Sequence, residues 1–398
     1  MTHLDVESLI NPHLRAMEPY APIVPFEMLS RRLGRKPEDI VKLDANENPY
    51  GASPRALQAI ASASALHIYP DPDQTLLREA ISAYIGVPAE HILCGAGGDE
   101  VIDLIGRAFI QAGDAIIDLP PTFGMYRWEA DVVNAQYVRV PRRADFSIDV
   151  EAVERLVNEE GRGERRDSQG SHRQSSSTHF KLLFVTNPNN PDGSVICEVD
   201  LRRLLALPVV VVLDEAYIDF STQPSRAGWV LQHDNLIVLR TFSKLAGMAG
   251  LRVGYGIFPL AVIKHLWKIK QPYTPNVAGA IGAIAALSDA AYLRDSVQRI
   301  VAERARMGEL LSELGWLHPL PSEANFILCR IKDAHPELVE GRAPTSLPIG
   351  KRVKLAMEQH GVLVRWFDKD GLRDCIRISV GRPDQTDKLI AALKAIAG

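Results

Sequence analysis

The stretch 239–252 reads LRTFSKLAGMAGLR, and the interpretation of the chain starts from it. In it Lys244 follows two hydroxyl residues, Thr241 and Ser243, at the end of an apolar strand pattern, and Arg252 comes after a run of small residues. A lysine amine with a lowered pKa is a nucleophile, and its commonest covalent chemistry is a Schiff base with a carbonyl. Guanidinium and hydroxyl groups suit a phosphate. The stretch therefore indicates a site for a phosphorylated carbonyl compound, although a Ser-Lys pair taken alone is more often an ordinary surface loop.

The composition is that of a globular protein with reduced thiols. The 398 residues are 46% apolar and 24% charged, and a chain of this length usually forms two domains. The net charge of −4 gives no reason to expect nucleic acid or an anionic membrane as partner. No apolar run approaches the ~18 residues of a membrane span. Cys94, Cys197, Cys329 and Cys375 lack metal-site or disulfide spacing, so we expect a soluble cytoplasmic protein without a bound metal.

A glycine-rich turn, CGAGGDE at 94–100, follows a short apolar segment and precedes a helical pattern. Unobstructed backbone N–H groups at the start of a helix form an anion site. Gly98, Asp99 and Glu100 are therefore candidates for phosphate binding. The spacing is not G-x-G-x-x-G, which disfavours a nicotinamide site, and Asp99 could also be a simple helix cap.

Two further apolar segments end in polar residues. The segment 181–186 leads to Asn190, and the valine run 209–213 leads to Asp214 and Tyr217. Such a β-branched run predicts a parallel strand buried on both faces. A carboxylate at its end needs a cationic partner. The ring nitrogen of pyridoxal phosphate, a phosphorylated aldehyde, would provide one, and Asp214 would then keep that ring able to accept electrons. A structural cap is the competing interpretation of Asp214.

A smaller α+β unit is predicted after residue 290. Its strand patterns contain Arg365 and Arg377, and two guanidinium groups that converged on one cleft would bind an anionic substrate group. Earlier in the chain, Phe123 follows a strand pattern, where aromatic residues often line a ligand crevice. Packing beneath a loop is the alternative for Phe123, and ordinary surface exposure is the alternative for each arginine.

Four motifs occur in a fixed order along the chain. They are Asn-Asn-Pro-Asp-Gly (189–193), Asp-Glu-Ala-Tyr (214–217), Thr-Phe-Ser-Lys to Gly-Leu-Arg (241–252) and Ile-Arg-Ile-Ser-Val-Gly (376–381). Together they resemble the fold type I pyridoxal-phosphate aminotransferases, over nearly the whole chain apart from polar insertions at about 159–179 and 335–349. The resemblance implies an α/β fold, with a large doubly wound domain whose sheet is mainly parallel and a smaller α+β domain. The implied domains are an N-terminal arm with part of the small domain (1–54), the large cofactor-binding domain (55–285) and the small domain (286–398).

Within that superfamily, the stretches 19–34, 42–51 and 364–368 are most similar to the histidinol-phosphate aminotransferase family. This likeness implies transamination of L-histidinol phosphate with 2-oxoglutarate to give imidazole acetol phosphate and glutamate, a reaction of histidine biosynthesis. An aromatic amino acid aminotransferase, or a phospho-amino-acid decarboxylase of the same fold, remains an alternative because the same arginine pair can hold a carboxylate.

The resemblance also assigns roles to individual residues. Lys244 would carry the Schiff base with pyridoxal 5′-phosphate and move a proton during the reaction, while Asp214 would pair with the pyridinium. Asn190 and Tyr217 would hold the ring oxygen, and Phe123 would stack on the ring. The other assigned residues are, for the cofactor phosphate, Gly98, Asp99, Glu100, Thr241, Ser243 and Arg252; for the substrate, Tyr20, Asn48, Arg365 and Arg377; and, from a neighbouring subunit, Tyr69. A residue shared in this way implies a homodimer with shared active sites.

Overall fold

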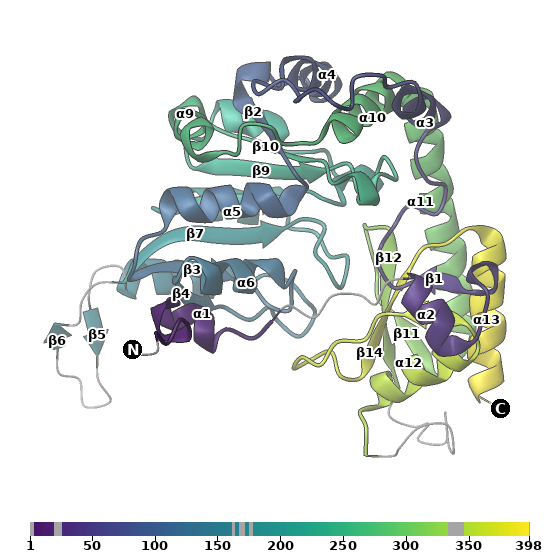
Figure 1. Cartoon of the computed structure of the whole chain (residues 1–398). Helices are drawn as coiled ribbons and strands as arrows, with labels where there is room; N and C mark the ends of the chain where they lie inside the picture. The colour runs from purple at the N-terminus through teal and green to yellow at the C-terminus, as the bar shows by residue number, and fades with distance from the viewer. Residues whose placement is uncertain are drawn as a thin grey trace.

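The computed structural model describes residues 4–19, 26–160, 164–166, 172–174, 178–332 and 346–397. Within these ranges the chain forms a large α/β region around one sheet and a smaller α+β region beside it (Figure 1). The long helix α11 (Ala290–Glu313) runs along one side of the molecule, from the large region to the small one (Figure 1).

The large sheet has seven strands among the described residues, in the order β2-β10-β9-β8-β7-β3-β4. Every neighbouring pair is parallel except the two that β10 makes with β2 and β9. The strands are β2 (Ile92–Gly95), β3 (Asp114–Asp118), β4 (Gln136–Arg139), β7 (His179–Thr186), β8 (Val210–Asp214), β9 (Leu236–Thr241) and β10 (Gly254–Ile257). The predicted mainly parallel sheet is confirmed.

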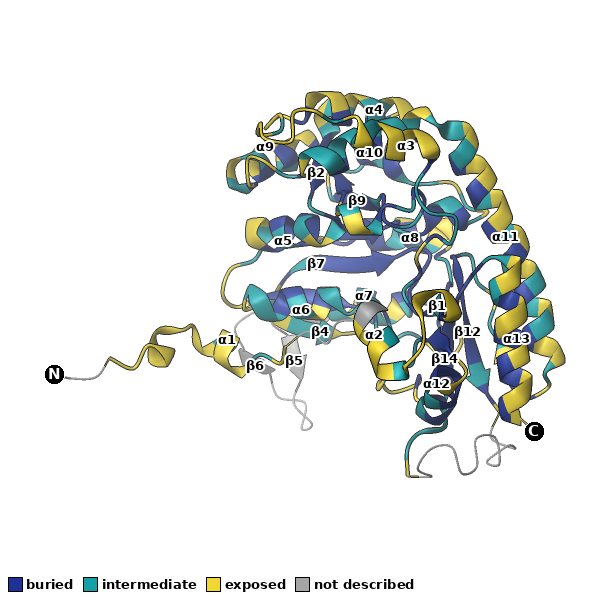
Figure 2. Ribbon diagram, turned by 45° about the vertical axis from the view of Figure 1, so that its right-hand side comes forward, coloured by how far each residue is buried: buried dark blue, intermediate teal, exposed yellow. Residues whose placement is uncertain are grey.

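The valine run of β8 shows why this sheet forms. Val211 and Leu213 pack into the hydrophobic cluster on one face, and Val212 packs into the cluster on the other. Side chains of a strand alternate between its two faces, so a strand covered on both sides has to be apolar throughout. Figure 2 accordingly shows the central strands buried, with exposed residues on the outer surfaces of the helices.

Helices cover both faces of the large sheet. Those packed into one cluster are α5 (Gly98–Phe109), α6 (Met125–Val132) and α9 (Leu260–Ile269). Those packed into the other are α3 (Pro54–Ala61), α4 (Thr75–Ile85), α7 (Val150–Arg155), α8 (Glu198–Leu205) and α10 (Val277–Ser288). Helix α3 begins where the Ser53 hydroxyl accepts a hydrogen bond from Ala56 N at 3.1 Å, with Pro54 at its first position. Both features favour a helix start.

The small region joins the two ends of the chain. Strand β1 (Val41–Leu43) pairs in parallel with β13 (Val362–Val364). Strands β11 (Leu317–Pro319), β12 (Phe326–Ile331) and β14 (Cys375–Ser379) form an antiparallel sheet. Helices α11, α12 (Ile349–Gln359) and α13 (Pro383–Ala397) cover it. The predicted domain limits, 1–54, 55–285 and 286–398, stay a prediction.

Strand β10 corrects one expectation. The alanine-rich composition of the segment after Lys244 predicts helix as far as about residue 290, yet 254–257 is a strand of the large sheet. A Cβ atom on Gly254 would lie 2.4 Å from Gly98 N, and one on Gly256 would lie 2.4 Å from the Phe258 ring. The two glycines therefore serve close packing of this strand against α5 and its own turn.

The remaining segments lie at the edges. Helices α1 (Pro12–Ala16) and α2 (Phe26–Leu33) precede the sheets. Residues 161–163, 167–171 and 175–177 of the predicted insertion 159–179 lie outside the described residues, and its described parts include the paired strands β5 (Glu164–Arg166) and β6 (His172–Gln174). Of the insertion 335–349, residues 335–345 likewise lie outside them. Within the described ranges no single helix has the length and hydropathy of a membrane span, and only the bent pair α10 and α11, 82° apart, passes on length and composition together.

Candidate active site

Lys244 lies in the turn that follows β9. Its Nζ donates a hydrogen bond to Ala45 O at 3.2 Å and lies 5.8 Å from the centre of the Tyr217 ring. Burial is the main cause, and the charge of Arg377 the second, of a pKa lowered to about 8. A substantial fraction of the amine is therefore neutral near physiological pH, which is the form a nucleophile requires.

Asp214 ends β8 and is buried. One carboxylate oxygen accepts a hydrogen bond from Ala216 N at 2.9 Å, and the other accepts one from the Tyr126 hydroxyl at 2.7 Å. Burial raises the pKa of Asp214, while these two hydrogen bonds lower it. The ionised form thus has two donors, and a cationic group facing it would stabilise it further.

Lys244 and Asp214 line one cavity of about 150 Å³. The other predicted residues on its wall are Gly98, Asp99, Phe123, Asn190, Tyr217, Thr241, Ser243 and Arg252. These residues come from turns after β2, β3, β7, β8 and β9, because the carboxyl ends of parallel strands meet at one edge of a sheet. The structure therefore brings most of the predicted site together.

The end of the cavity at α5 is shaped for an anion. Helix α5 starts at Gly98, and no side chain caps its first amides. Gly97 has a positive φ of 86°, and a Cβ atom on it would lie 2.4 Å from Arg252 Nη2, so a side chain there would displace that guanidinium. Arg252 pairs with Asp99 at 2.7 Å beside the helix start. Free backbone N–H groups, the helix dipole and an adjacent arginine fit the phosphate of the expected cofactor.

The predicted substrate arginines are neighbours. Arg365 N donates to Arg377 O at 2.9 Å, and Arg377 N donates to Arg365 O at 2.8 Å. Both guanidinium groups lie over the Phe367 ring, 5.6 and 5.4 Å from its centre. Arg377 is buried, and its Nη1 donates to Asn190 Oδ1 at 2.6 Å, which ties the small region to the wall of the cavity.

Two predicted site residues, Glu100 and Asn48, make side-chain contacts outside the cavity. The Glu100 carboxylate turns away from the cavity, accepting from Ala96 N and from the Thr274 hydroxyl at 3.0 Å. Only its backbone remains available for the predicted phosphate contact. The Asn48 amide donates to Leu245 O at 2.9 Å and does not line the cavity, so it holds the residue next to the lysine in place.

One more predicted residue, Tyr69, lies away from the cavity. Tyr69 is 76% exposed and stacks on Tyr273 with ring centres 4.4 Å apart, so within one chain it does not reach the Lys244 cavity. Tyr20 lies outside the described residues. The functional roles of all the predicted site residues stay predictions.

The sequence did not single out Tyr126 and Asn46. Tyr126 is fully buried and, besides Asp214, shares a hydrogen bond with the Thr186 hydroxyl at 2.8 Å. Asn46 has a positive φ of 55° and its amide donates to the Tyr217 hydroxyl at 3.1 Å. Asparagine tolerates this left-handed backbone better than most residues, so its position in the Asn-rich turn 42–51 was the available signal. For Tyr126 the available signal was its place three residues after Phe123, as an aromatic residue that follows a strand pattern.

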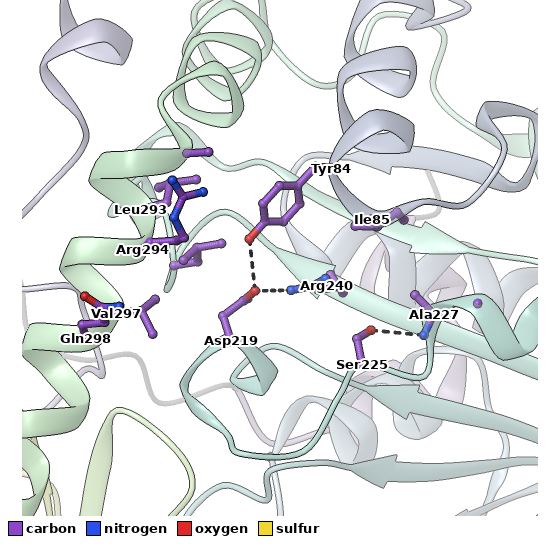
Figure 3. A pocket seen from close by; sticks show the side chains of 13 residues that line it. Tyr84, Ile85, Asp219, Ser225, Ala227, Arg240, Leu293, Arg294, Val297 and Gln298 are labelled. Carbon is purple, nitrogen blue, oxygen red and sulfur yellow. Dashed lines mark hydrogen bonds and ion pairs between the residues drawn. The ribbon is translucent and has the colours of Figure 1, made fainter.

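A larger hollow, of about 550 Å³, is lined by side chains from α4, β9 and α11, among others (Figure 3). The Asp219 carboxylate there pairs with Arg240 at 2.5 Å and accepts from the Tyr84 hydroxyl at 3.4 Å. Arg240 lines this hollow and the smaller cavity alike. Despite its size, the larger hollow contains neither Lys244 nor Asp214, so the smaller cavity is the candidate active site.

Comparison with known proteins agrees with this geometry. The family described as Aminotransferase class I and II matches residues 38–393. Histidinol-phosphate aminotransferase 1, chloroplastic, of Arabidopsis thaliana is 47% identical over 98% of this chain and 86% of its own length. Histidinol-phosphate aminotransferase of Roseiflexus castenholzii is 46% identical over 98% of this chain and 99% of its own length.

A solved structure is similar over the whole fold. It is histidinol-phosphate aminotransferase from Sinorhizobium meliloti in complex with pyridoxal-5′-phosphate, with a TM-score of 0.81 and 28% identity, covering 100% of this chain and 98% of that one. The two relatives from Arabidopsis thaliana and Roseiflexus castenholzii match nearly the whole of this chain. Their identity of 46–47% is high enough to show a shared family and not only a shared fold. The chain belongs to the aminotransferase class I and II family and, within it, to the histidinol-phosphate aminotransferases.

Proposed function

We propose that this chain transfers the amino group of L-histidinol phosphate to 2-oxoglutarate, giving imidazole acetol phosphate and glutamate in histidine biosynthesis, with pyridoxal 5′-phosphate as cofactor. The observation that carries the proposal is the placement of the Lys244 amine and the Asp214 carboxylate on one cavity. The near full-length identity to proteins named for this activity supports the substrate.

The residues present fit the cofactor. The uncapped start of α5, with Thr241, Ser243 and Arg252 beside it, suits the phosphate. Asp214 suits a ring nitrogen that carries a proton, and Phe123 on the cavity wall suits the face of the ring. When bound, pyridoxal phosphate supplies a carbonyl that holds an amine and a ring that accepts electrons.

Lys244 performs the proton transfers in this proposal. Its Nζ is held by Ala45 O at 3.2 Å and has a pKa of about 8, so it can both accept and return a proton near neutral pH. The proton is taken from the amine-bearing carbon of the substrate. Asp214 stays ionised with the help of the Tyr126 hydroxyl and so holds positive charge at the opposite end of the cavity.

Arg365 and Arg377 bind the phosphate group of the substrate in this proposal. Their backbones are paired and both guanidinium groups lie over the Phe367 ring, so the two charges lie close together. A dianionic phosphate uses two guanidinium groups better than a single carboxylate does. Asn190 couples this substrate end to the cofactor end through its hydrogen bond with Arg377.

A second copy of the chain completes the site in this proposal. Tyr69 is exposed next to other exposed apolar residues, Leu66 and Ile68, and an apolar surface of this kind is typical of an interface. We propose a homodimer in which Tyr69 reaches the cofactor phosphate of the partner, and a cytoplasmic location for the enzyme. Sedimentation measurements with and without the change Tyr69→Ala test the assembly.

The test of the function is amino transfer from L-histidinol phosphate to 2-oxoglutarate by the purified, cofactor-loaded enzyme, compared with phenylalanine as donor. We expect a much higher kcat/KM for histidinol phosphate. Equal values would overturn the substrate assignment in favour of an aromatic aminotransferase. Release of carbon dioxide from a phosphorylated amino acid would instead identify a decarboxylase.

A further inference from the structure

Four cations follow one another outward from Lys244, namely Arg377, Arg365, Lys369 and Arg139. The charge of Arg377 lowers the pKa of Lys244, and Arg377 is paired through its backbone with Arg365. Burial lowers the pKa of Lys369, and the charges of Arg139 and Arg365 lower it further. Geometry supports this succession, because Arg377 donates to Asn190 of the cavity wall and forms a backbone bridge with Arg365.

The outer three of these four cations are not neutralised by ion pairs with residues that the structure describes. Among the residues that the structure describes, Arg139, Arg365 and Lys369 form no ion pair, whereas the nearby Arg373 pairs with Asp368 at 2.9 Å and with Asp370 at 3.4 Å. Asp368 and Asp370, the two carboxylates of the 366–373 loop, are thus paired with Arg373. Like charges held near one another are unfavourable unless an anion comes between them.

One acid does face Lys369. Asp118 is buried at the end of β3, and its carboxylate accepts from the Tyr137 hydroxyl and from Leu119 N at 2.9 Å. Its charge favours the protonated amine of Lys369 without forming an ion pair with it. Asp118 therefore offsets part of the positive charge but leaves the Lys369 ammonium able to bind another anion.

Lys369 also lies beside the cavity. A Cβ atom on Gly124 would be 3.8 Å from Lys369 Nζ, and Gly124 follows Phe123, which lines the cavity. Lys369 belongs to the small region and Arg139 ends β4 of the large one. Arg139 is the register partner of Asp118 across β3 and β4, so one cation from each region, neither in an ion pair among the described residues, lies next to Asp118.

We propose that Lys369 and Arg139 form an outer recruiting site for a dianionic phosphate monoester, which draws the phosphorylated end of the substrate toward Arg365 and Arg377. The inference rests on the proposed function and adds to it two residues that select phosphorylated over unphosphorylated amines. A cleft lined by one sign of charge raises the rate at which oppositely charged ligands arrive.

The kinetic test compares histidinol phosphate with unphosphorylated histidinol as amino donors. The variants are Lys369→Met and Arg139→Gln, with Lys388→Met on the exposed face of α13 as a matched control and Lys369→Arg as a rescue. At low salt each single loss of charge is expected to lower kcat/KM for histidinol phosphate by roughly two- to fivefold, with kcat unchanged. The loss should shrink as salt rises and should be absent for histidinol, for the control and for the rescue variant. An equal, salt-independent loss for both donors would show a merely structural role and overturn the proposal.

The second test does not depend on turnover. Inorganic phosphate is titrated into the cofactor-loaded enzyme and its heat of binding is measured. Weaker binding by Lys369→Met than by Lys388→Met supports the recruiting site, and equal binding by both overturns it. If the unchanged enzyme does not turn over histidinol phosphate, the proposed function fails by itself, and this titration still decides the outer site.

Discussion

The hydroxyl of Tyr126 is the group whose removal tests the acid end of the site most directly. It donates to Asp214 Oδ2 at 2.7 Å and shares a hydrogen bond with Thr186 at 2.8 Å. The ring is fully buried and stacks on Phe184 with centres 4.4 Å apart. The change Tyr126→Phe keeps that ring and its packing, so it removes the hydrogen bonds and little else.

The magnitude follows from the charge of Asp214. A hydrogen bond to an ionised group contributes about 1.5–3 kcal/mol, and one to a neutral group about 0.5–1.5 kcal/mol. Without the hydroxyl the pKa of Asp214, which burial already raises, rises further. Removing the hydroxyl therefore costs the ionised form of Asp214 about 1–1.5 kcal/mol more stabilisation than it costs the protonated form, which is the difference between those two ranges. Since a bound ring nitrogen needs the ionised form, the cofactor dissociation constant should increase by roughly 5- to 12-fold at a pH low enough to protonate Asp214 in the apoenzyme.

The assay is a titration of the apoenzyme with pyridoxal phosphate, followed by absorbance, at several pH values. The ratio of dissociation constants between Tyr126→Phe and the unchanged enzyme should shrink as pH rises, because at high pH Asp214 is ionised in both. Tyr137→Phe is the matched control, since its hydroxyl also donates to a buried carboxylate, Asp118, which does not line the cavity. Equal affinity of Tyr126→Phe and the unchanged enzyme at every pH would refute the reasoning.

Four further outcomes are expected. Lys244→Ala should abolish turnover and the visible absorbance of the lysine-bound cofactor, and a variant that keeps both would contradict its role. The rate at which the apoenzyme takes up cofactor should rise with pH and level off above about 8, where the Lys244 amine is mostly neutral; a stopped-flow profile that is flat across this range would count against it. Arg365→Gln should raise KM for a phosphorylated donor by roughly 10- to 100-fold, the effect of about 1.5–3 kcal/mol for a charged hydrogen bond, with little change for an unphosphorylated one. Asp219→Ala leaves Arg240 buried without its carboxylate and should lower stability by about 3–5 kcal/mol, as measured by urea unfolding of the apoenzyme; a loss below about 1 kcal/mol would not fit a buried pair.

The sequence predicted the fold wherever burial dictated residue type. The run 209–213 had to be apolar throughout because Val211 and Val212 face opposite clusters, and so it was recognisable as a central parallel strand. Strand β10 was missed because Gly254 and Gly256 are chosen for close backbone packing, which leaves no hydrophobic pattern to detect. Patterns of side chains report burial well and close backbone contacts poorly.

The residues of the candidate site also differ in how far the sequence could predict them. Asp214, Asn190 and Lys244 could be placed together in advance because each follows a strand, and parallel strand ends share one edge of the sheet. Tyr126 and Asn46 could not, since their contacts depend on the direction of a helix face and on a left-handed turn. A position at the end of a strand therefore does not identify these two residues, although their hydrogen bonds set the charge and orientation of Asp214 and Tyr217.

Burial acts on the two ends of the cavity in opposite directions, and this explains why they belong together. It lowers the pKa of Lys244 and raises that of Asp214, so it pushes both groups toward their neutral forms. A neutral amine is what a carbonyl requires, whereas a neutral acid could not hold a protonated ring. The Tyr126 hydroxyl and Ala216 N therefore work against burial at the acid end only. At the amine end the charge of Arg377 acts in the same direction as burial, so one arginine both lowers the pKa of the lysine and belongs to the pair predicted to bind the substrate phosphate. An anion bound at Arg377 would weaken its effect on Lys244 and raise the pKa of that amine, so arrival of a phosphorylated substrate should itself make Lys244 a better proton acceptor.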